Sequence, residues 1–344
     1  MNSVGIGVIG LGLAAKPHAL ALRDLQASMQ VRVHGGYSPS AQWRTHFAAT
    51  HGLPVVDSLD ALLHDKAVQA VIILTPPNTH AELALQAARA GKHVLLEKPM
   101  EVTYTGARAL NEAVAATGKS LGIVFQFRFR PGALRLRELM AGRPLGDLIS
   151  VSASVRWWRS AQYYGEPGRG MKARDGGGVL ITQAIHTLDL MLSLAGPVKR
   201  VAAQCRTSPL RKIDSEDIAC ASLEFANGAV GVLDAITTAY PGFPECIEFT
   251  GTQASAVLEA ERLSVHLHDQ PVEIVEGSLS GGGGADPMAF SHEPHRKLIE
   301  NFCYAIRDGR APLVSGTSAL PVHALIDAML ESSTTQRWVE VAGA

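Results

Sequence analysis

The first third of the chain alternates short apolar runs with longer stretches in which apolar residues recur at helical spacing. The apolar runs, rich in valine, isoleucine and leucine, predict buried strands at 4–9, 31–37, 55–56, 70–74 and 94–96. The stretches between and after them predict helices at 14–27, 41–50, 59–64, 79–90 and 104–117. Buried strands connected by helices are typical of a parallel sheet that is covered on both faces. We therefore expect residues 1–122 to form a doubly wound α/β domain, because crossover connections are right-handed.

The pattern changes after about residue 121, where apolar and polar residues alternate over longer runs. These runs predict strands at 148–157, 198–206, 218–225, 229–238, 245–251 and 255–259. Asn227-Gly228 is a hairpin signal, since both residues accept a positive φ. Helical spacing returns at 132–140, 179–194, 294–307 and 318–335. Residues 123–344 are therefore predicted to form an α+β domain with a large open, mostly antiparallel sheet, and the glycine-rich segment 280–286 to be a surface linker or a lid.

Composition and charge narrow the class of protein. The chain has 344 residues, which fits two domains, and 47% of them are hydrophobic, enough for a sizeable core. The formal net charge is −1, so no overall field attracts nucleic acid or an anionic membrane. No apolar run approaches the roughly 18 residues needed to cross a bilayer. The N-terminus shows no basic leader, and we expect a cytoplasmic protein.

Cysteines and histidines give no metal-binding pattern. The four cysteines form no CxxC pair and are too few for a disulfide scaffold. His292 and His295 could share one face of a helix, but no cysteine or carboxylate lies at zinc-ligand spacing. We expect no metal site.

A glycine-rich motif, Gly10-Leu11-Gly12-Leu13-Ala14-Ala15, follows the first predicted strand and begins the first helix. It fits the GxGxxA form of the dinucleotide-binding motif. In that motif the first glycine makes the tight turn, and the second lets the backbone approach a pyrophosphate. The free N–H groups at the start of the helix attract the phosphates. The motif's position directly after a buried strand predicts a Rossmann domain that binds NAD or NADP.

The end of the second predicted strand lacks the acidic residue that usually binds the ribose 2′-hydroxyl. The sequence there is Gly35-Gly36-Tyr37-Ser38-Pro39-Ser40. Without a carboxylate, nothing in this loop repels a 2′-phosphate. Ser38 and Ser40 can donate hydrogen bonds, Tyr37 can stack on adenine, and Arg44 follows in the next helix. We expect NADP to bind at least as well as NAD.

Further motifs follow in order along the chain: 75–80 (TPPNTH), 97–99 (EKP), 126–131 (QFRFRP), and 175–178 (DGGG) before a helix with His186 and Asp189. With the glycine motif and Asn227-Gly228, this order resembles the Gfo/Idh/MocA family of glucose-fructose oxidoreductases, inositol dehydrogenases and their relatives. The resemblance extends from Val4 to about Arg337. It implies a Rossmann domain followed by a substrate domain whose sheet often forms a subunit interface, so we expect a homodimer or homotetramer.

The resemblance also implies a chemistry, hydride transfer between nicotinamide and a hydroxyl-bearing or carbonyl carbon of a sugar, sugar acid or cyclitol. Lys98, at the carboxyl end of a parallel strand, would transfer the proton, and burial there would lower its pKa. His186 would contact the same hydroxyl, and we expect the two side chains to approach one another. Glu97 would bind the nicotinamide ribose, and the Lys98–Pro99 bond is a candidate for the cis isomer.

Two sets of residues complete the predicted site. The predicted cofactor-binding residues are Gly10, Leu11, Gly12, Leu13, Ala14, Tyr37, Ser38, Arg44, Thr75, Pro76, Asn78, His80, Glu97, Lys98 and Gln126. The predicted substrate-binding residues are Arg128, Trp157, Tyr163, Arg169, Lys172, Thr182, Gln183 and His186, with Arg159 and Tyr164 as further candidates. Arginines and aromatic rings suit polyhydroxylated or carboxylated ligands.

One position departs from the family. Thr182 stands four residues before His186, where the family often has an aspartate, and Gln183 lies beside it. This weakens the prediction of an inositol dehydrogenase but leaves hydride transfer in place. Two alternatives stay open: an NAD-dependent glycosidase with no net redox change, and a non-catalytic dinucleotide-binding sensor.

Overall fold

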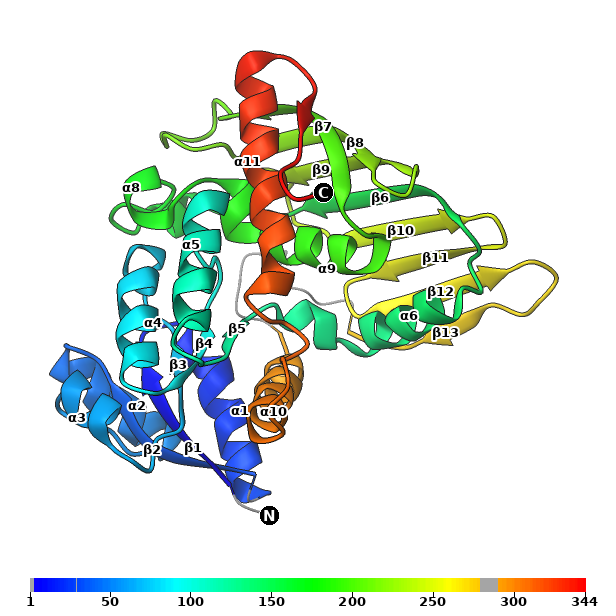
Figure 1. The fold of residues 1–344 in the computed structure, drawn as a ribbon. Coiled ribbons are helices and arrows are strands. Elements are labelled where there is room, and N and C mark those ends of the chain that lie inside the picture. The colour runs from blue at the N-terminus through cyan, green and yellow to red at the C-terminus, as the bar shows by residue number, and fades with distance from the viewer. Residues whose placement is uncertain (1–2, 29, 279–289) are drawn as a thin grey trace. The chain divides into compact units, whose positions relative to one another are not determined.

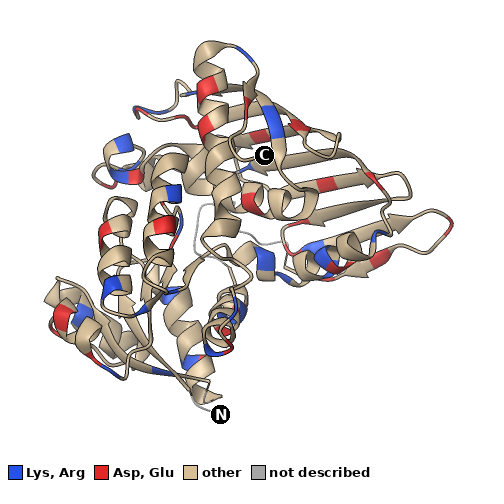
Figure 2. Ribbon diagram, viewed as in Figure 1, with Lys and Arg blue, Asp and Glu red and all other residues tan. Residues whose placement is uncertain are grey.

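The computed structural model describes residues 3–28, 30–278 and 290–344, and the chain divides into two compact units. The first unit comprises Met1–Gln126 and Ser291–Leu320, and the second comprises Phe127–Phe290 and Pro321–Ala344. The predicted glycine-rich segment 280–286 lies outside the described residues. Acidic and basic residues are interspersed over the elements of both units (Figure 2).

The first unit is built on a parallel sheet with the strand order β2-β1-β3-β4-β5. Its strands are β1 (Val4–Ile9), β2 (Val31–Tyr37), β3 (Ala70–Ile73), β4 (His93–Leu96) and β5 (Leu121–Ile123). The predicted strand at 55–56 is reduced to a single bridge between Val55 and Gly36. β5 was not predicted, because three residues are too few to show a pattern. All residues of β1 and β3 are buried, as expected of strands covered on both faces.

Six helices of the first unit cover this sheet: α1 (Ala15–Ala27), α2 (Ala41–His51), α3 (Leu59–His64), α4 (His80–Arg89), α5 (Tyr104–Ala115) and α10 (Glu293–Arg307) (Figure 1). Ser40, Ser58 and Thr103 each accept a hydrogen bond from a backbone N–H of the first turn that they cap. Short 3-10 turns lie at Pro77–Thr79, Gln126–Phe129 and Thr317–Ala319.

The position of α10 differs from the predicted division of the chain at residue 122. This helix was expected in the second domain, but it packs against α1 in the first unit. Its buried face includes Leu298 and Phe302, and Phe302 lies against Gly122 of β5, where a Cβ atom would come within 2.9 Å of the ring. The amphipathic pattern predicts the helix but does not say which sheet the apolar face covers.

The second unit contains a nine-stranded sheet with the order β13-β12-β11-β10-β6-β9-β8-β7-β14. Its strands are β6 (Leu148–Arg156), β7 (Val198–Arg206), β8 (Ile218–Phe225), β9 (Val230–Ile236), β10 (Cys246–Gly251), β11 (Ala254–Glu259), β12 (Arg262–Leu267), β13 (Glu273–Val275) and β14 (Val339–Glu340). Neighbouring strands are antiparallel except for β6 and β9. The last three strands were not predicted, because they are short or carry few apolar residues.

One face of this sheet is covered by helices of the second unit (Figure 1). These are α6 (Pro131–Gly142), α9 (Ile185–Ala195) and α11 (Leu320–Thr335), while α7 (Ala161–Tyr164) and α8 (Lys172–Asp175) are single turns. The β7 backbone N–H groups of Ala203 and Cys205 donate hydrogen bonds to the hydroxyls of Ser332 and Ser333 on α11. α9 follows a π-helical turn, Leu180–Ala184, within the helix predicted at 179–194.

The helical stretch Lys172–Ala195 is long and apolar enough to span a bilayer by length and composition, although polar residues interrupt its apolar run. Of its most apolar part, 83% is buried inside the protein. It also carries His186 and Asp189. These are the properties of a core helix.

Candidate functional site

The glycine motif lies where the sequence predicted it, between β1 and α1. Gly10 has φ +95°, and a Cβ atom there would lie 2.8 Å from the carbonyl carbon of Leu74, so only glycine fits. Around Gly12, by contrast, a Cβ atom would meet nothing within 4 Å. Ala14 gives the start of α1 no side-chain cap, and the N–H of Ala15 donates to the carbonyl of Gly12 at 3.0 Å. An open space at an uncapped helix N-terminus fits a pyrophosphate.

An acidic residue from further along the chain lies beside the loop after β2, and the sequence did not reveal it. Arg44 donates hydrogen bonds to the carbonyl oxygens of Ser38 (2.7 Å) and Pro39 (3.3 Å). Its guanidinium also pairs with Asp57 at 3.1 Å. Asp57 lies 13 residues further along the chain than Arg44, outside the strand-end window where an acid was sought. The loop itself has no carboxylate, but part of the charge of Arg44 is compensated.

His80, predicted to bind the cofactor, is buried and contacts two backbone carbonyl groups. Its ring is 1% exposed, and each ring nitrogen lies 2.8 Å from a backbone carbonyl oxygen, one of Pro99 and one of Thr75. Desolvation lowers the pKa of this imidazole. His80 therefore joins the loop after β3 to the Lys98–Pro99 peptide, which is cis as the resemblance implied. Thr75 also accepts a hydrogen bond from the hydroxyl of Thr79 at 2.7 Å.

Glu97 and Lys98 lie at the carboxyl end of β4, on the same sheet edge as the glycine motif. The Glu97 carboxylate lies 2.9 Å from Nε2 of His18 through one oxygen and accepts the Lys98 N–H through the other. Burial alone would raise the pKa of this carboxyl, but the His18 hydrogen bond and the nearby charges of His18, Lys98 and His295 lower it to about 2. His18 was missed because nothing in its surrounding sequence marks it. Gln126, also in this unit, is buried with its Oε1 lacking a partner among the described residues.

The DGGG motif shapes the start of the helix that carries His186. Gly176 has φ +80°. At Gly178 a Cβ atom would lie 1.8 Å from the carbonyl oxygen of Glu216. That oxygen accepts the N–H of Val179, and the Glu216 side chain accepts the N–H of Leu180 at 3.1 Å. The glycines thus let Glu216 cap the helix, whose π-turn then leads directly into His186. Such turns often occur at functional sites.

The imidazole of His186 is held by the QFRFRP motif. Its ring stacks on Phe127 with 4.9 Å between centroids. The guanidinium of Arg130 lies over the same phenyl ring and pairs with the buried carboxylate of Glu245 at 2.5 Å. These contacts fix the plane of the imidazole within the second unit. A stacked, buried histidine is suited to orient a single ligand group.

Arg128, predicted to bind substrate, forms an ion pair with the helix that carries His186. Its guanidinium forms two hydrogen bonds with Asp189, of 2.7 and 2.5 Å, and the Asp189 side chain is 1% exposed. The bidentate pair uses the Nε and Nη2 edge of the guanidinium. The pair anchors α9 one turn beyond His186.

Several predicted substrate residues do lie together in the second unit. Gln183 donates a hydrogen bond to the hydroxyl of Tyr163 at 3.2 Å, and Arg169 lies 4.9 Å from the Tyr163 ring centroid. The Thr182 hydroxyl contacts the Gln183 side chain and donates to the Gly178 carbonyl at 2.6 Å, so it is held against its own helix. Tyr163, Thr182 and Gln183 border a small cavity that is also lined by Tyr164, Asp175 and Glu216.

Arg159 connects this group to Trp157. Its guanidinium lies 4.9 Å from the Trp157 ring and 5.6 Å from the Tyr163 ring. The buried Trp157 Nε1 has no hydrogen-bond partner within the described ranges. Lys172, by contrast, is exposed; its backbone N–H donates to Asp214 at 2.8 Å, and its carbonyl accepts the N–H of Gly176 at 3.0 Å.

Comparison with known proteins gives consistent matches over both units. Residues 4–125 match the GFO/IDH/MocA oxidoreductase family, NAD-binding Rossmann fold, and residues 133–257 match the GFO/IDH/MocA C-terminal domain. The chain is 27% identical over 350 residues to inositol 2-dehydrogenase of Rhizobium meliloti, covering 99% of this chain and all of that one. It is 27% identical over 351 residues to D-apiose dehydrogenase of Paraburkholderia graminis, covering 97% of this chain and 88% of that one.

A solved structure shares the fold. Levoglucosan dehydrogenase in complex with NADH and levoglucosan superposes with a TM-score of 0.87 at 24% identity. The similarity covers 99% of this chain and all of that one.

Proposed function

The chain belongs to the GFO/IDH/MocA family of oxidoreductases, and from this we propose that it transfers a hydride between a nicotinamide dinucleotide and a hydroxyl-bearing carbon of a sugar, sugar acid or cyclitol. One observation carries the proposal. The open glycine loop at Gly12 and the strand end with Lys98 lie on one edge of the same parallel sheet. Ligands of such sheets bind at this edge.

The first unit has the residues to hold the dinucleotide. Gly10 and Gly12, with Leu11, Leu13 and Ala14, would surround the pyrophosphate at the uncapped start of α1. Thr75, Pro76, Asn78 and Gln126 would face the nicotinamide half, and the orphaned Oε1 of Gln126 supports a polar ligand there. When bound, the nicotinamide would supply the hydride acceptor or donor.

Lys98 is the proposed proton-transfer group. Oxidation of a secondary alcohol releases the hydroxyl proton while hydride leaves the same carbon, and an amine is a competent base for it. His186, held by its stack on Phe127, is proposed to orient the reacting hydroxyl. The Thr182 hydroxyl donates a hydrogen bond to a backbone carbonyl, so it cannot replace the carboxylate that relatives often have at this position.

The proposed substrate class follows from the second unit. One group of neighbouring side chains supplies an aromatic ring, an amide and two guanidinium groups, which suit a polyhydroxylated ring: Tyr163, Gln183, Arg159 and Arg169. The named relatives act on inositol and D-apiose, which supports this class.

A panel of sugars, sugar acids and cyclitols with NAD and NADP, monitored at the absorbance of reduced nicotinamide, tests the function. We expect reduction of the dinucleotide with at least one compound. Sugar hydrolysis without net reduction would instead support the glycosidase alternative. Dinucleotide binding without either reaction would support the sensor.

We propose that NADP binds at least as tightly as NAD, because the Ser38 loop has no carboxylate of its own and holds the Arg44 guanidinium. Asp57 is the opposing group. Ser38→Asp is expected to shift the ratio of dissociation constants toward NAD by about tenfold, or about 1.4 kcal/mol. Asp57→Asn should shift it toward NADP. Fluorescence titration with both dinucleotides measures the ratio, and tighter binding of NAD by the unaltered protein would contradict the proposal.

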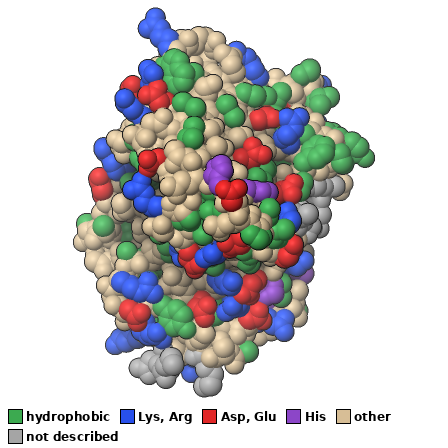
Figure 3. Space-filling model, turned by 90° about the vertical axis from the view of Figure 1, so that its right-hand side faces the viewer, with side chains coloured by type: hydrophobic (Ala, Val, Ile, Leu, Met, Phe, Trp, Pro, Cys, Tyr) green, Lys and Arg blue, Asp and Glu red, His purple; other side chains and the backbone are tan. Residues whose placement is uncertain are grey.

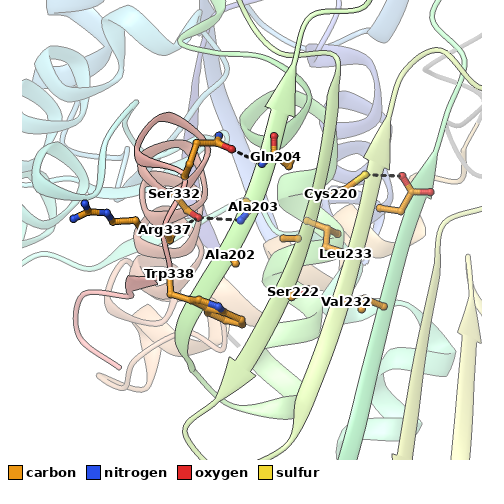
Figure 4. Close-up of a pocket in the computed structure, with 13 residues that line it drawn as sticks. Ala202, Ala203, Gln204, Cys220, Ser222, Val232, Leu233, Ser332, Arg337 and Trp338 are labelled. Atoms are coloured by element: carbon orange, nitrogen blue, oxygen red, sulfur yellow. Dashed lines mark hydrogen bonds between the residues drawn. The ribbon is translucent and has the colours of Figure 1, made fainter.

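We further propose that the protein is a homodimer or homotetramer formed through the uncovered face of the nine-stranded sheet. Val230 and Val232 on that face are 57% and 53% exposed. Figure 4 shows Val232 beside Ser222 and Cys220 on adjacent strands, with Trp338 at the edge of the groove they line. Sedimentation equilibrium is the direct test.

We expect a partner of small-molecule size and a cytoplasmic location, where reduced thiols such as the four free cysteines persist. Positive and negative side chains are interspersed over the face seen in Figure 3, which supports neither nucleic acid nor an anionic membrane as partner. Cell fractionation measures the location.

A further inference from the structure

A buried side-chain contact links the helix of the nucleotide loop to the proposed proton-transfer lysine. His18 lies in α1, one turn after the loop, and its Nε2 lies 2.9 Å from Glu97 Oε1. The other oxygen, Oε2, accepts the backbone N–H of Lys98 at 3.0 Å. Both oxygens of Glu97 are therefore engaged, one by each neighbour.

The protonation of this contact follows from its geometry. A carboxylate only accepts hydrogen bonds, so Nε2 of His18 must carry the proton. The His18 ring is 1% exposed, and its Nδ1 has no partner in the described part of the chain. Its one recorded hydrogen bond is thus the bond to Glu97. His295 of α10 packs edge-on against it at 5.0 Å between centroids, which keeps the ring in place.

The titratable groups around Glu97 come from three helices and from the next residue in the chain. His18 approaches from α1, His295 from α10, His80 from α4, and Lys98 follows directly in the chain. Glu101 is the further acid that acts on His80. Groups that can carry positive charge thus outnumber acids here, and Glu97 is their shared carboxylate.

We propose that His18 is a positioning residue for Lys98: it holds Glu97 as an oriented carboxylate, and Glu97 fixes the Lys98 peptide and stabilises its ammonium form. The inference rests on the function proposed for Lys98. It implies that a dinucleotide seated on α1 and the lysine that serves it are connected through the side chains of His18 and Glu97. It also means that Glu97 opposes the lowering of the Lys98 pKa that burial would cause.

The first test concerns the bond between His18 and Glu97. His18→Gln keeps an N–H donor near the position of Nε2, whereas His18→Leu removes it, and His18→Asn is too short to reach. His292→Leu is the matched control, because it removes another histidine–carboxylate contact of α1, the 2.7 Å pair between His292 at the start of α10 and Asp24, without touching Glu97.

We expect His18→Leu and His18→Asn to lower kcat at least roughly tenfold, because small misplacements of reacting groups cost that much. Dinucleotide affinity should stay within about threefold. Without the bond, burial should protonate Glu97 at higher pH, so an acid limb should appear in the pH dependence of kcat. His18→Gln should restore most of kcat and remove that limb. If the His18 variants only lost stability, the fraction of active protein would fall in all of them, and the pH dependence of kcat would not change.

The second test does not depend on turnover. Reductive 13C-methylation of the lysines, with the Lys98 signal assigned by Lys98→Arg, gives the titration midpoint of Lys98 by NMR. Glu97→Gln should lower this midpoint by roughly one unit or more, because a neighbouring opposite charge is removed. If the substrate panel finds no reaction, the proposed function fails, while this measurement still decides whether Glu97 sets the titration of Lys98.

Three results would overturn the inference. One is an unchanged Lys98 midpoint in Glu97→Gln. Another is equal kcat and pH profiles for His18→Leu and His292→Leu. The third concerns the ligand-type atoms of His18, Glu97 and His295, which lie within 4.8 Å of one another. Stoichiometric zinc in the purified protein, lost on chelation, would make this group a metal site instead.

Discussion

Lys98→Ala is expected to lower turnover roughly 10²–10⁴-fold, the usual contribution of a general acid–base group. Dinucleotide affinity should change little, because the contacts to the pyrophosphate and the adenosine ribose are proposed at the Gly10–Ala15 and Tyr37–Arg44 segments. The loss should therefore appear in kcat. Steady-state kinetics on a substrate from the panel, with a fluorescence titration of the dinucleotide, separates the two effects.

The matched control is Lys66→Ala, which removes an exposed lysine of the same unit. It should leave kcat unchanged. If Lys98→Ala keeps full turnover on a verified substrate, Lys98 does not transfer the proton. His186→Ala should lower kcat and also raise KM, since it is proposed to orient the hydroxyl.

Arg128→Leu is expected to lower the free energy of unfolding by roughly 3–5 kcal/mol, the usual cost of leaving one partner of a buried ion pair without the other. The Asp189 carboxylate would remain 1% exposed with its bidentate partner gone. Burial already raises the pKa of this carboxyl against the opposing effect of Arg128. Urea denaturation at neutral pH, followed by circular dichroism, measures the loss.

Arg200→Leu is the control, because its pair with Glu224 is solvent-exposed and should contribute at most about 1 kcal/mol. The double variant with Arg128→Leu and Asp189→Leu should recover part of the stability, since no buried charge is left. A variant with normal stability and a raised KM would instead return Arg128 to the substrate site.

The periodic pattern was sufficient for much of the fold. β1, β2, β7 and β8 begin and end where the sequence predicted, because each is a long run of alternating or continuous apolar residues. The strands β5, β13 and β14 have two or three residues each, which is too short for any period to appear. The sequence pattern also cannot tell which of two cores an amphipathic helix covers. For this reason α10 was expected in the second domain, although it belongs to the first unit.

The candidate site could be predicted where a motif fixes the backbone geometry. It was predicted less well where the role of a side chain depends on the residues that contact it in the fold. The turn at Gly10 follows from the glycine motif and the cis Lys98–Pro99 bond from the family resemblance, and both are found. Arg128 and His80 carry suitable chemistry, but their partners lie 61 and 19 residues away, and only the fold shows which groups they contact. His18 is the converse, a residue with no motif that the fold brings to Glu97.

α10 and the segment after it belong to the first unit, although they follow the second unit in the sequence. This order has a consequence for biosynthesis. The edge strand β5 bonds to residue 314 through Ile123, and α1 packs against α10, so the nucleotide-binding unit needs Ser291–Leu320 to complete its core. A ribosome must therefore finish nearly the whole polypeptide before this unit can close. Until then α1 would expose the apolar side that α10 covers, which is a surface that chaperones recognise. A fragment ending at residue 126 would keep this exposure permanently and is expected to aggregate.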